Sequence, residues 1–248
     1  NPDVSSIYEV PLILDNQGLT AKILKKLKLS VGKKDLREWG KMVEGIKTTR
    51  KPVKVGIVAK YIDSGSFTLE DAYICVNEAL KHAGAQEEVN IEFQWISSEN
   101  LEKMDEEKLA EILGSLSGIV VPQGWGSRGT EGKIKAIKFA REHKIPFLGL
   151  CFGMQMAAIE FARNVLGLNK AHTSEADQKT PDPVVHIMPH QAEYLAKKQY
   201  GGTIRLGAWP MVTQKGTLLS SIYEGTKTSE RHRHRYEFNS DYEKAFEK

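Results

Sequence analysis

A cysteine between two glycines is the feature of this chain best suited to covalent chemistry. Cys151 lies in the segment Gly-Leu-Cys-Phe-Gly at residues 149–153, at the end of an apolar run. The run predicts a buried strand, and the apolar positions after Cys151 follow helical spacing. Small neighbours permit a sharp strand-to-helix turn that exposes a nucleophile, and a helix N-terminus favours the thiolate. Cys151 is therefore a candidate nucleophile, although a lone cysteine among apolar residues is also typical of a buried core.

The segments before Cys151 alternate between strand and helix patterns, and they are the elements that must position it. Strands are predicted at 53–59, 91–96, 118–121 and 145–150, with helices at 69–83, at 105–113 and around residues 134–140. This order predicts an α/β fold with an open, mostly parallel, doubly wound sheet of the flavodoxin-like type. Ligands bind such sheets beyond the carboxyl ends of the strands. Because the glycine-rich segment 122–126 and Cys151 both follow strands, we expect them to be neighbours.

A cysteine that attacks a carbonyl group needs N–H donors for the oxyanion that forms. The glycine-rich segment supplies candidates at Gly124 and Gly126, and the residue after the nucleophile, Phe152, supplies another. These backbone groups predict an oxyanion hole beside Cys151.

Composition narrows the function classes. The 248 residues are 40% hydrophobic and carry a formal charge of only +3, which argues against general attraction to nucleic acids or membranes. No long apolar run or signal-peptide pattern is present, so a cytoplasmic protein is expected. The two cysteines, Cys75 and Cys151, form neither a disulfide framework nor a zinc-binding spacing. Cys75 is interpreted as a core residue of the helix at 72–80.

Residues 1–51 are predicted to be an extension, and residues 52–248 the main domain. The extension contains apolar positions interrupted at 16–18, then an amphipathic helix at 34–47, and a linker at 48–52. Its opening, Asn-Pro-Asp without an initiator methionine, suggests that a longer polypeptide was cut here. We expect this extension to expose apolar surface that a partner domain would cover.

The C-terminal part has a looser pattern. Residues 169–183 are interpreted as a polar loop, 194–200 as a mobile insertion and 201–207 as a turn that enters a strand. The run Arg-His-Arg-His-Arg-Tyr-Glu at 231–237 alternates like a strand. Alternation sends arginines to one face and histidines to the other, so a shared metal site is not expected.

Several segments resemble the glutamine amidotransferase domain of the CTP synthase family. They are VPQGWGSRGTEGKI (121–134), IPFLGLCFGMQ (145–155), EFARNVLGL (160–168), GGTIRLG (201–207) and ERHRHRYEFN (230–239), and residues 1–14 are similar to the segment that leaves the family's synthetase domain. The resemblance implies a class I amidotransferase fold. It also implies that Cys151 forms a glutamyl thioester and releases ammonia for the ATP-dependent conversion of UTP to CTP.

The resemblance also implies a glutamine site. Gln155, Glu175 and Arg235 match the family's glutamine-binding positions, and their chemistry suits an amino acid, whose ammonium needs a carboxylate and whose carboxylate needs an arginine. From the residues alone, the favoured interpretation of Glu175 is a solvated loop carboxylate and that of Arg235 a surface strand residue.

An effector region is implied by the same comparison. The matching positions are Trp125, Arg128, Arg205 and Leu206, in a region where the family binds the allosteric effector GTP. No cofactor is expected in this domain, because ATP and Mg²⁺ belong to the family's synthetase domain. The implied partners are L-glutamine and that synthetase domain, in a homotetrameric enzyme. The chain alone is expected to be a monomer or weak dimer.

Two departures from the family pattern matter. Gln123 stands where the family has a glycine in its oxyanion loop, which would strain or crowd a site that needs positive φ, although the backbone N–H remains. The family's His-Pro-Glu segment is not found before Lys248, and His190 is not followed by Pro-Glu. We therefore expect this chain to bind glutamine better than it hydrolyses it. The alternatives are a catalytically impaired binding or regulatory module, and a cysteine hydrolase acting on other substrates.

Overall fold

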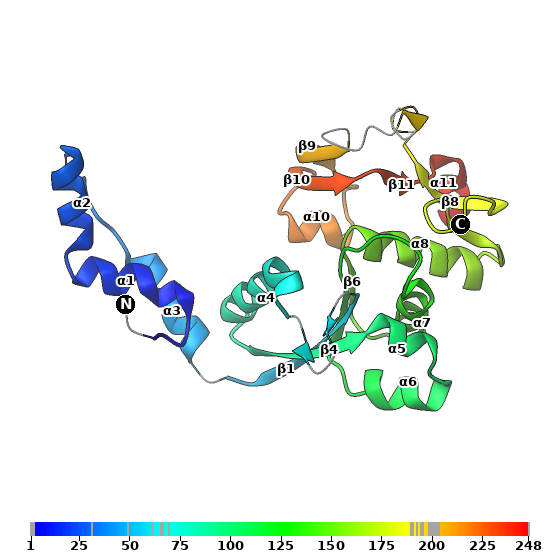
Figure 1. Ribbon diagram of the computed structural model, residues 1–248, viewed down its shortest axis with the longest axis horizontal. Helices are drawn as coiled ribbons and strands as arrows, with labels where there is room; N and C mark the ends of the chain where they lie inside the picture. The colour runs from blue at the N-terminus through cyan, green and yellow to red at the C-terminus, as the bar shows by residue number, and fades with distance from the viewer. Residues whose placement is uncertain are drawn as a thin grey trace.

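The computed structural model describes residues 3–30, 32–48, 50–60, 62–64, 67–68, 70–188, 191, 193, 196–197 and 204–247. The predicted insertion at 194–200 and the start of the predicted turn at 201–207 lie largely outside these residues. Figure 1 shows an α/β body and a group of N-terminal helices that stands beside it. That group consists of a 3₁₀ turn and three helices: η1 (Ile7–Glu9), α1 (Val10–Asn16), α2 (Leu19–Leu27) and α3 (Arg37–Lys47).

The body is built on a four-stranded parallel sheet. Its strands lie in the order β4 (Asn90–Ser97), β1 (Pro52–Ala59), β5 (Gly118–Val121) and β6 (Phe147–Gly149). Every neighbouring pair is parallel. The chain first moves to one side of β1 and then to the other, which is the doubly wound order predicted from the sequence. The sequence prediction of an open α/β sheet is confirmed.

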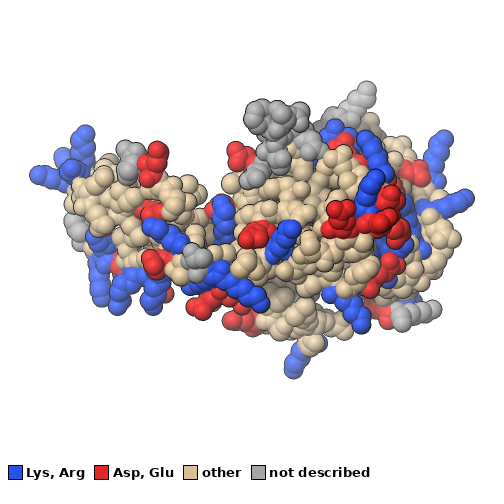
Figure 2. Space-filling model, turned by 90° about the horizontal axis from the view of Figure 1, so that it is seen from below, with Lys and Arg blue, Asp and Glu red and all other residues tan. Residues whose placement is uncertain are grey.

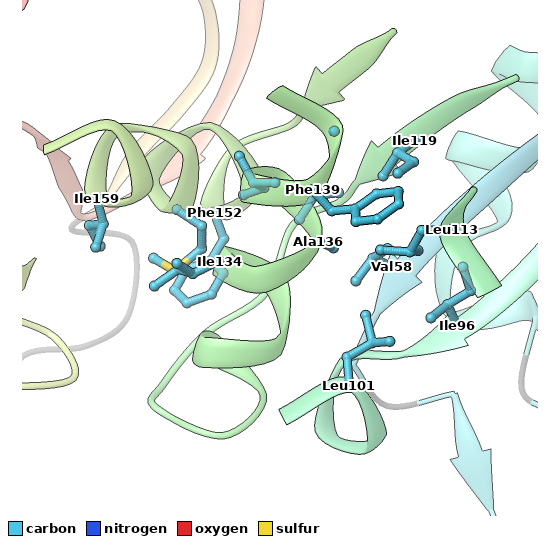
Figure 3. Close-up of a cluster of buried hydrophobic side chains, with 14 of the residues drawn as sticks. Val58, Ile96, Leu101, Leu113, Ile119, Ile134, Ala136, Phe139, Phe152 and Ile159 are labelled. Atoms are coloured by element: carbon cyan, nitrogen blue, oxygen red, sulfur yellow. The ribbon is translucent and has the colours of Figure 1, made fainter. Parts of the chain in front are cut away.

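Helices cover both faces of this sheet. Alternate residues of β1 belong to different apolar clusters: Ile57 packs with Tyr73 and Val76 near helix α4 (Ile74–Gln86), whereas Val58 packs on the opposite face. The second cluster is the larger one, and Figure 3 shows part of it around Phe139. Its helices are α5 (Ser98–Glu102), α6 (Glu106–Leu113), α7 (Thr130–Glu142) and α8 (Phe152–Asn164).

Two smaller sheets follow the body. Strands β7 (Ala171–Thr173), β8 (Asp182–Ile187) and β11 (Tyr236–Phe238) form one, and strands β9 (Arg205–Val212) and β10 (Lys227–His234) form an antiparallel hairpin. The prediction of a loop throughout 169–183 was therefore wrong, because β7 and the start of β8 lie in it. The remaining elements are β2 (Asp63–Ser64), β3 (Phe67–Thr68), η2 (Glu70–Tyr73), α10 (Leu218–Ile222), η3 (Ser240–Tyr242) and α11 (Glu243–Phe246).

Cys75 is exposed, so its interpretation as a core residue was wrong. Helix α4 buries Val76, Asn77 and Gly84, and Cys75 lies on a different face of the helix. The spacing of apolar residues predicts an amphipathic helix, but it does not settle which residues face the core. Neighbouring residues point about 100° apart around the helix axis, so an error of one position moves a side chain off the buried face.

The N-terminal helices contact the body through α4. The Tyr8 ring meets His82 edge to face with centroids 4.9 Å apart, and Lys47 bridges to Glu9 at 2.8 Å within the extension. Several of its large apolar side chains remain exposed, namely Ile7, Leu19, Ile23, Leu27, Leu29 and Trp39. Figure 2 shows charges of both signs interspersed over the body, with broad uncharged areas between them. Among the described residues, no helix is long and apolar enough to cross a membrane.

Candidate active site

Cys151 occupies a strained turn between β6 and α8. Its backbone has φ 53° and ψ −106°, a conformation that costs a non-glycine residue on the order of 1–3 kcal/mol. Such strain persists only where the surroundings enforce it, and it lifts the side chain clear of the sheet. The predicted strand-to-helix elbow is present at this cysteine.

The flanking glycines are required by close backbone contacts. A Cβ on Gly153 would lie 1.8 Å from the carbonyl oxygen of Val121, and one on Gly149 would lie 2.7 Å from the Met154 nitrogen. No larger residue fits either position without moving the backbone. The sharp turn at Cys151 therefore depends on the packing of α8 against the end of β5.

The side chain of Cys151 opens into a cavity of about 300 Å³. The cavity brings together the carboxyl ends of β5 and β6, the turn after β7 and the hairpin. It is lined by Gly124, Trp125, Cys151, Gln155, Glu175, Ile204, Arg233, His234, Arg235 and Tyr236. The expected proximity of the glycine-rich segment and Cys151 is confirmed, and the three predicted glutamine-binding residues line the same space.

Each of these three residues is held by a polar contact. Gln155 is buried and donates from Nε2 to the carbonyl of Tyr236 at 2.8 Å. Glu175 accepts from the backbone N–H of Gly126 at 2.9 Å. Arg235 donates to the side-chain oxygen of Gln191 at 3.0 Å. Glu175 and Arg235 are thus fixed elements of the cavity, rather than a solvated loop carboxylate and a free surface arginine.

Burial shifts the acid–base properties of the site. Desolvation raises the pKa of the Cys151 thiol, and this effect exceeds the opposing effects of the Phe152 N–H and the Lys133 charge. The helix start does act in the predicted direction, because the Phe152 N–H lowers the pKa of the thiol, but desolvation is the larger effect and the net pKa is raised. Desolvation likewise raises the pKa of Glu175, against the hydrogen bond from Gly126 and the charge of Lys60.

The segment 122–126 also borders a second cavity of about 540 Å³, which Cys151 lines as well. Gln123 and Trp125 both line it, together with Tyr73, Arg231 and Arg233. Gln123 is half-buried and does not have a positive φ, so the backbone strain considered for this position from the sequence does not arise. Its carbonyl oxygen lies 3.4 Å from the Tyr73 hydroxyl.

The other predicted effector residues lie outside the linings of these two cavities. Arg128 is largely exposed and pairs with Glu99 at 3.2 Å. Arg205 pairs with Glu237 at 3.4 Å, and its guanidinium lies 5.2 Å from the Trp209 ring. Leu206 is exposed on β9. The structure therefore brings Trp125 to the Cys151 cavity but spreads the remaining three over its rim and the hairpin.

The sequence analysis missed two lysines buried beneath the site. Lys60 and Lys133 are 1% and 0% exposed, and both ammonium groups lie near the Phe152 ring, at 4.3 and 5.6 Å from its centroid. Signals for both exist in the sequence. Lys60 directly follows an apolar strand, at the sheet edge where ligands bind, and Lys133 shares a helix face with Ile137 and Ala140.

Two histidines of β10 form a direct pair. His232 Nδ1 lies 2.8 Å from His234 Nε2, and His234 Nδ1 lies 2.9 Å from the Tyr236 carbonyl. Because a carbonyl can only accept, Nδ1 of His234 carries the proton, and its Nε2 accepts from His232. Within the part of the chain that the structure describes, no group of three or more His, Cys, Asp or Glu side chains is placed to hold a metal ion.

Comparison with known proteins agrees with this geometry. The family model for class I glutamine amidotransferases matches residues 68–247. The CTP synthase of Pyrococcus abyssi is 47% identical over 246 residues, covering 99% of this chain and 44% of the relative. That of Methanocaldococcus jannaschii is 48% identical over 248 residues, covering 99% and 44%. The chain thus spans less than half the length of the curated relatives it matches.

A solved structure shows the same fold. The glutaminase domain of Trypanosoma brucei CTP synthase, with bound acivicin, superposes with a TM-score of 0.68 at 31% sequence identity. The superposition covers 79% of this chain and 71% of that domain. The family model covers most of the chain, and the relatives found by sequence and by structure are of one kind. The chain belongs to the class I glutamine amidotransferases, as a glutaminase domain of the CTP synthase family.

Proposed function

We propose that Cys151 hydrolyses the side-chain amide of L-glutamine and that the ammonia serves a synthetase domain that converts UTP to CTP with ATP. The observation that carries this proposal is the strained cysteine elbow opening into a cavity lined by Glu175 and Arg235. A carboxylate and a guanidinium at one cavity suit the two charged groups of an amino acid.

The charged residues of the cavity favour one orientation of glutamine. Its ammonium group pairs with Glu175 and its carboxylate with Arg235, which leaves the side-chain amide to reach Cys151. Gln155 completes the wall beside α8, where its amide is held by the Tyr236 carbonyl. Acivicin, the ligand of the Trypanosoma brucei domain, is proposed to occupy the same space.

The reaction follows from the groups around the sulfur. The thiolate adds to the amide carbon, and the oxyanion accepts hydrogen bonds from the backbone N–H groups of Gln123, Gly124 and Phe152. The C–N bond then breaks, the nitrogen takes a proton and leaves as ammonia, and a glutamyl thioester remains on Cys151. Water hydrolyses the thioester to glutamate. The proton that the sulfur loses on forming the thiolate balances the proton that the leaving nitrogen takes.

The remaining parts of the proposal concern the whole enzyme. Residues 1–51 are the linker from the synthetase domain, whose apolar side chains that domain would cover, and residues 52–248 are the amidotransferase domain. Trp125, Arg128, Arg205 and Leu206 respond to GTP, while ATP and Mg²⁺ bind the synthetase domain. The full enzyme is a cytoplasmic homotetramer, and the two free cysteines of this chain suit a reducing compartment.

Intact mass spectrometry after acivicin treatment tests the proposal. We expect one adduct on Cys151, slowed by glutamine and abolished in Cys151→Ser. Cys75 provides the internal control, because it is exposed and lies outside both cavities. Adducts at Cys75 alone, or none on a folded chain, would contradict the proposal and favour a binding or regulatory module.

A further inference from the structure

The backbone of the oxyanion loop, residues 122–126, is held from below by the two buried lysines. Lys133 Nζ donates to the Pro122 carbonyl at 2.9 Å. Lys60 Nζ donates to the carbonyls of Trp125 and Gly126, both at 2.9 Å. Two fully buried ammonium groups therefore bind three carbonyls of a five-residue loop. Burying an ammonium group costs free energy, so packing alone does not account for two buried lysines at one loop.

Because each peptide group is planar, the direction of its carbonyl determines the direction of its N–H group. In a trans peptide the C=O of one residue and the N–H of the next point in opposite directions, and no described peptide bond is cis. The pattern is visible at one end of the loop. The Trp125 carbonyl accepts from Lys60, and the N–H of the same peptide, on Gly126, points the other way and donates to Glu175 in the cavity.

The same reasoning applies at the other end of the loop. The Pro122 carbonyl accepts from Lys133, so the N–H of Gln123, on the same peptide, points away from Lys133. Gln123 and Cys151 line the same cavity. The Lys133 ammonium also lies under Gly124, 3.7 Å from where a Cβ of that residue would be. Lys133 is thus in contact with the backbone that flanks the proposed oxyanion hole, at Pro122 and at Gly124.

We propose that Lys133 is a positioning residue for the amidotransferase reaction: by binding the Pro122 carbonyl it aims the Gln123 N–H at the oxyanion. This inference rests on the proposed role of Cys151. It also explains how a glutamine is tolerated at position 123, because the lysine fixes the peptide and not the side chain. The charge of Lys133 additionally lowers the pKa of the Cys151 thiol, and burial beside Lys60 lowers the pKa of Lys133 itself to about 7.

Lys133→Met in the intact enzyme, with its synthetase domain, tests the proposal, because methionine keeps the volume and removes the donor. A crystal structure of K133M is expected to show the Pro122–Gln123 peptide rotated. The kcat for glutamine hydrolysis is expected to fall on the order of 100-fold, as when one oxyanion donor is lost. The KM for glutamine should change little, since Glu175 and Arg235 remain. An unrotated peptide, or a rotated peptide with unchanged kcat, would overturn the inference.

Lys135→Met is the matched control. Lys135 lies on the same helix and also binds backbone carbonyls, those of Leu101, Glu102 and Met104, but away from Cys151. K135M is expected to lower the melting temperature without lowering kcat. K133M is expected to melt no lower than wild type, because it removes a buried charge. Equal losses of kcat in the two variants would show a merely structural role.

Alkylation by iodoacetamide separates positioning from charge. Displacement of iodide by a thiolate forms no oxyanion, so its rate reports thiolate content alone. In a Cys75→Ser background, K133M should lower this rate about tenfold at most, by raising the thiol pKa. An equal fall in alkylation and hydrolysis would mean that only the charge matters. Failure of the proposed function is distinct: wild type would then show no hydrolysis, while the crystal structure would still decide whether Lys133 orients the peptide.

Discussion

The two walls of the Cys151 cavity are built in different ways. The body wall consists of the oxyanion loop, the elbow and helices α7 and α8. Its elbow glycines, Gly149 and Gly153, leave no room for a Cβ, and Lys60 and Lys133 beneath it are fully buried. The hairpin wall consists of the end of β10 and the flanking residues Ile204 and Arg235; the hairpin of β9 and β10 is a two-stranded sheet separate from the central one. Along β10, exposed and half-exposed residues alternate, and none is buried.

This difference separates chemistry from recognition. The body wall supplies the reacting sulfur and the proposed oxyanion donors, which must be held to within a fraction of an ångström. The hairpin wall meets it through backbone groups, as where Cys151 Sγ lies 4.0 Å from the Arg233 carbonyl. A weakly buried hairpin can shift without disturbing the elbow, which suits a wall that responds to ligands.

Substitution of a glycine in each wall gives the largest expected contrast. Gly153→Ala places a Cβ 1.8 Å from the Val121 carbonyl oxygen, so α8 must move away from β5. We expect a loss of about 3 kcal/mol or more in the free energy of unfolding, measured in urea. Gly225→Ala, beside the hairpin, meets only the Tyr223 oxygen at 4.0 Å and should change that free energy by less than about 1 kcal/mol. Similar losses in both would show that the walls are equally constrained.

Most of the body wall was predictable because its signals are local. An apolar run, a cysteine and two glycines within nine residues encode strand, turn and helix, and the α/β alternation places the ends of β5 and β6 together. The orientation of Cys151 follows from that topology. The motif matches that placed Gln155, Glu175 and Arg235 at one site came from a family resemblance rather than from local pattern.

The rest depends on contacts between distant residues, which no local pattern encodes. Glu175 faces the cavity because it meets the N–H of Gly126, 49 positions earlier in the chain. The sign of the Cys151 pKa shift is set by desolvation, which exceeds the opposing effect of the helix start. Strand β7 was missed because it has only three residues, and it pairs with β8 through a register shift.

Removal of the Glu175 charge, on the cavity wall, gives the next largest expected effect, and it is an effect on the KM for glutamine. Glu175→Gln keeps the size and the acceptor for Gly126 but removes the charge that is proposed to bind the glutamine ammonium. A charged hydrogen bond is worth about 1.5–3 kcal/mol, so the KM for glutamine should rise about 10- to 100-fold. Glu237→Gln on β11, which loses only a half-exposed pair with Arg205, should leave KM nearly unchanged.

The pH dependence sharpens the same test. Burial raises the folded-state pKa of Glu175 above its ordinary value, so glutamine affinity of wild type should fall as the pH drops through that raised value. E175Q should lack this acid limb. The effect on stability has the opposite sign to the effect on glutamine affinity. The folded state binds the Glu175 proton more tightly than the unfolded state does, so the ionised carboxylate lowers the free energy of unfolding at neutral pH. E175Q should therefore unfold no more easily than wild type at pH 7, and a less stable variant would contradict the assigned burial.

The smallest expected effect is on the free energy of unfolding, when one arginine–carboxylate ion pair is removed from the hairpin and another from the body. Arg205→Met removes the pair with Glu237, in which both side chains are about 30% exposed, and should cost less than about 1 kcal/mol of unfolding free energy. Arg141→Met in α7 leaves Glu160, whose side chain is 2% exposed, with only the Asn164 amide of its two side-chain partners, and should cost about 1–2 kcal/mol, since the partial exposure of Arg141 limits the loss. Urea unfolding at low and high salt distinguishes the two, because salt screens only the exposed pair. A larger cost at Arg205 than at Arg141 would mean that the hairpin is the more rigid wall, and the division of labour drawn here would be reversed.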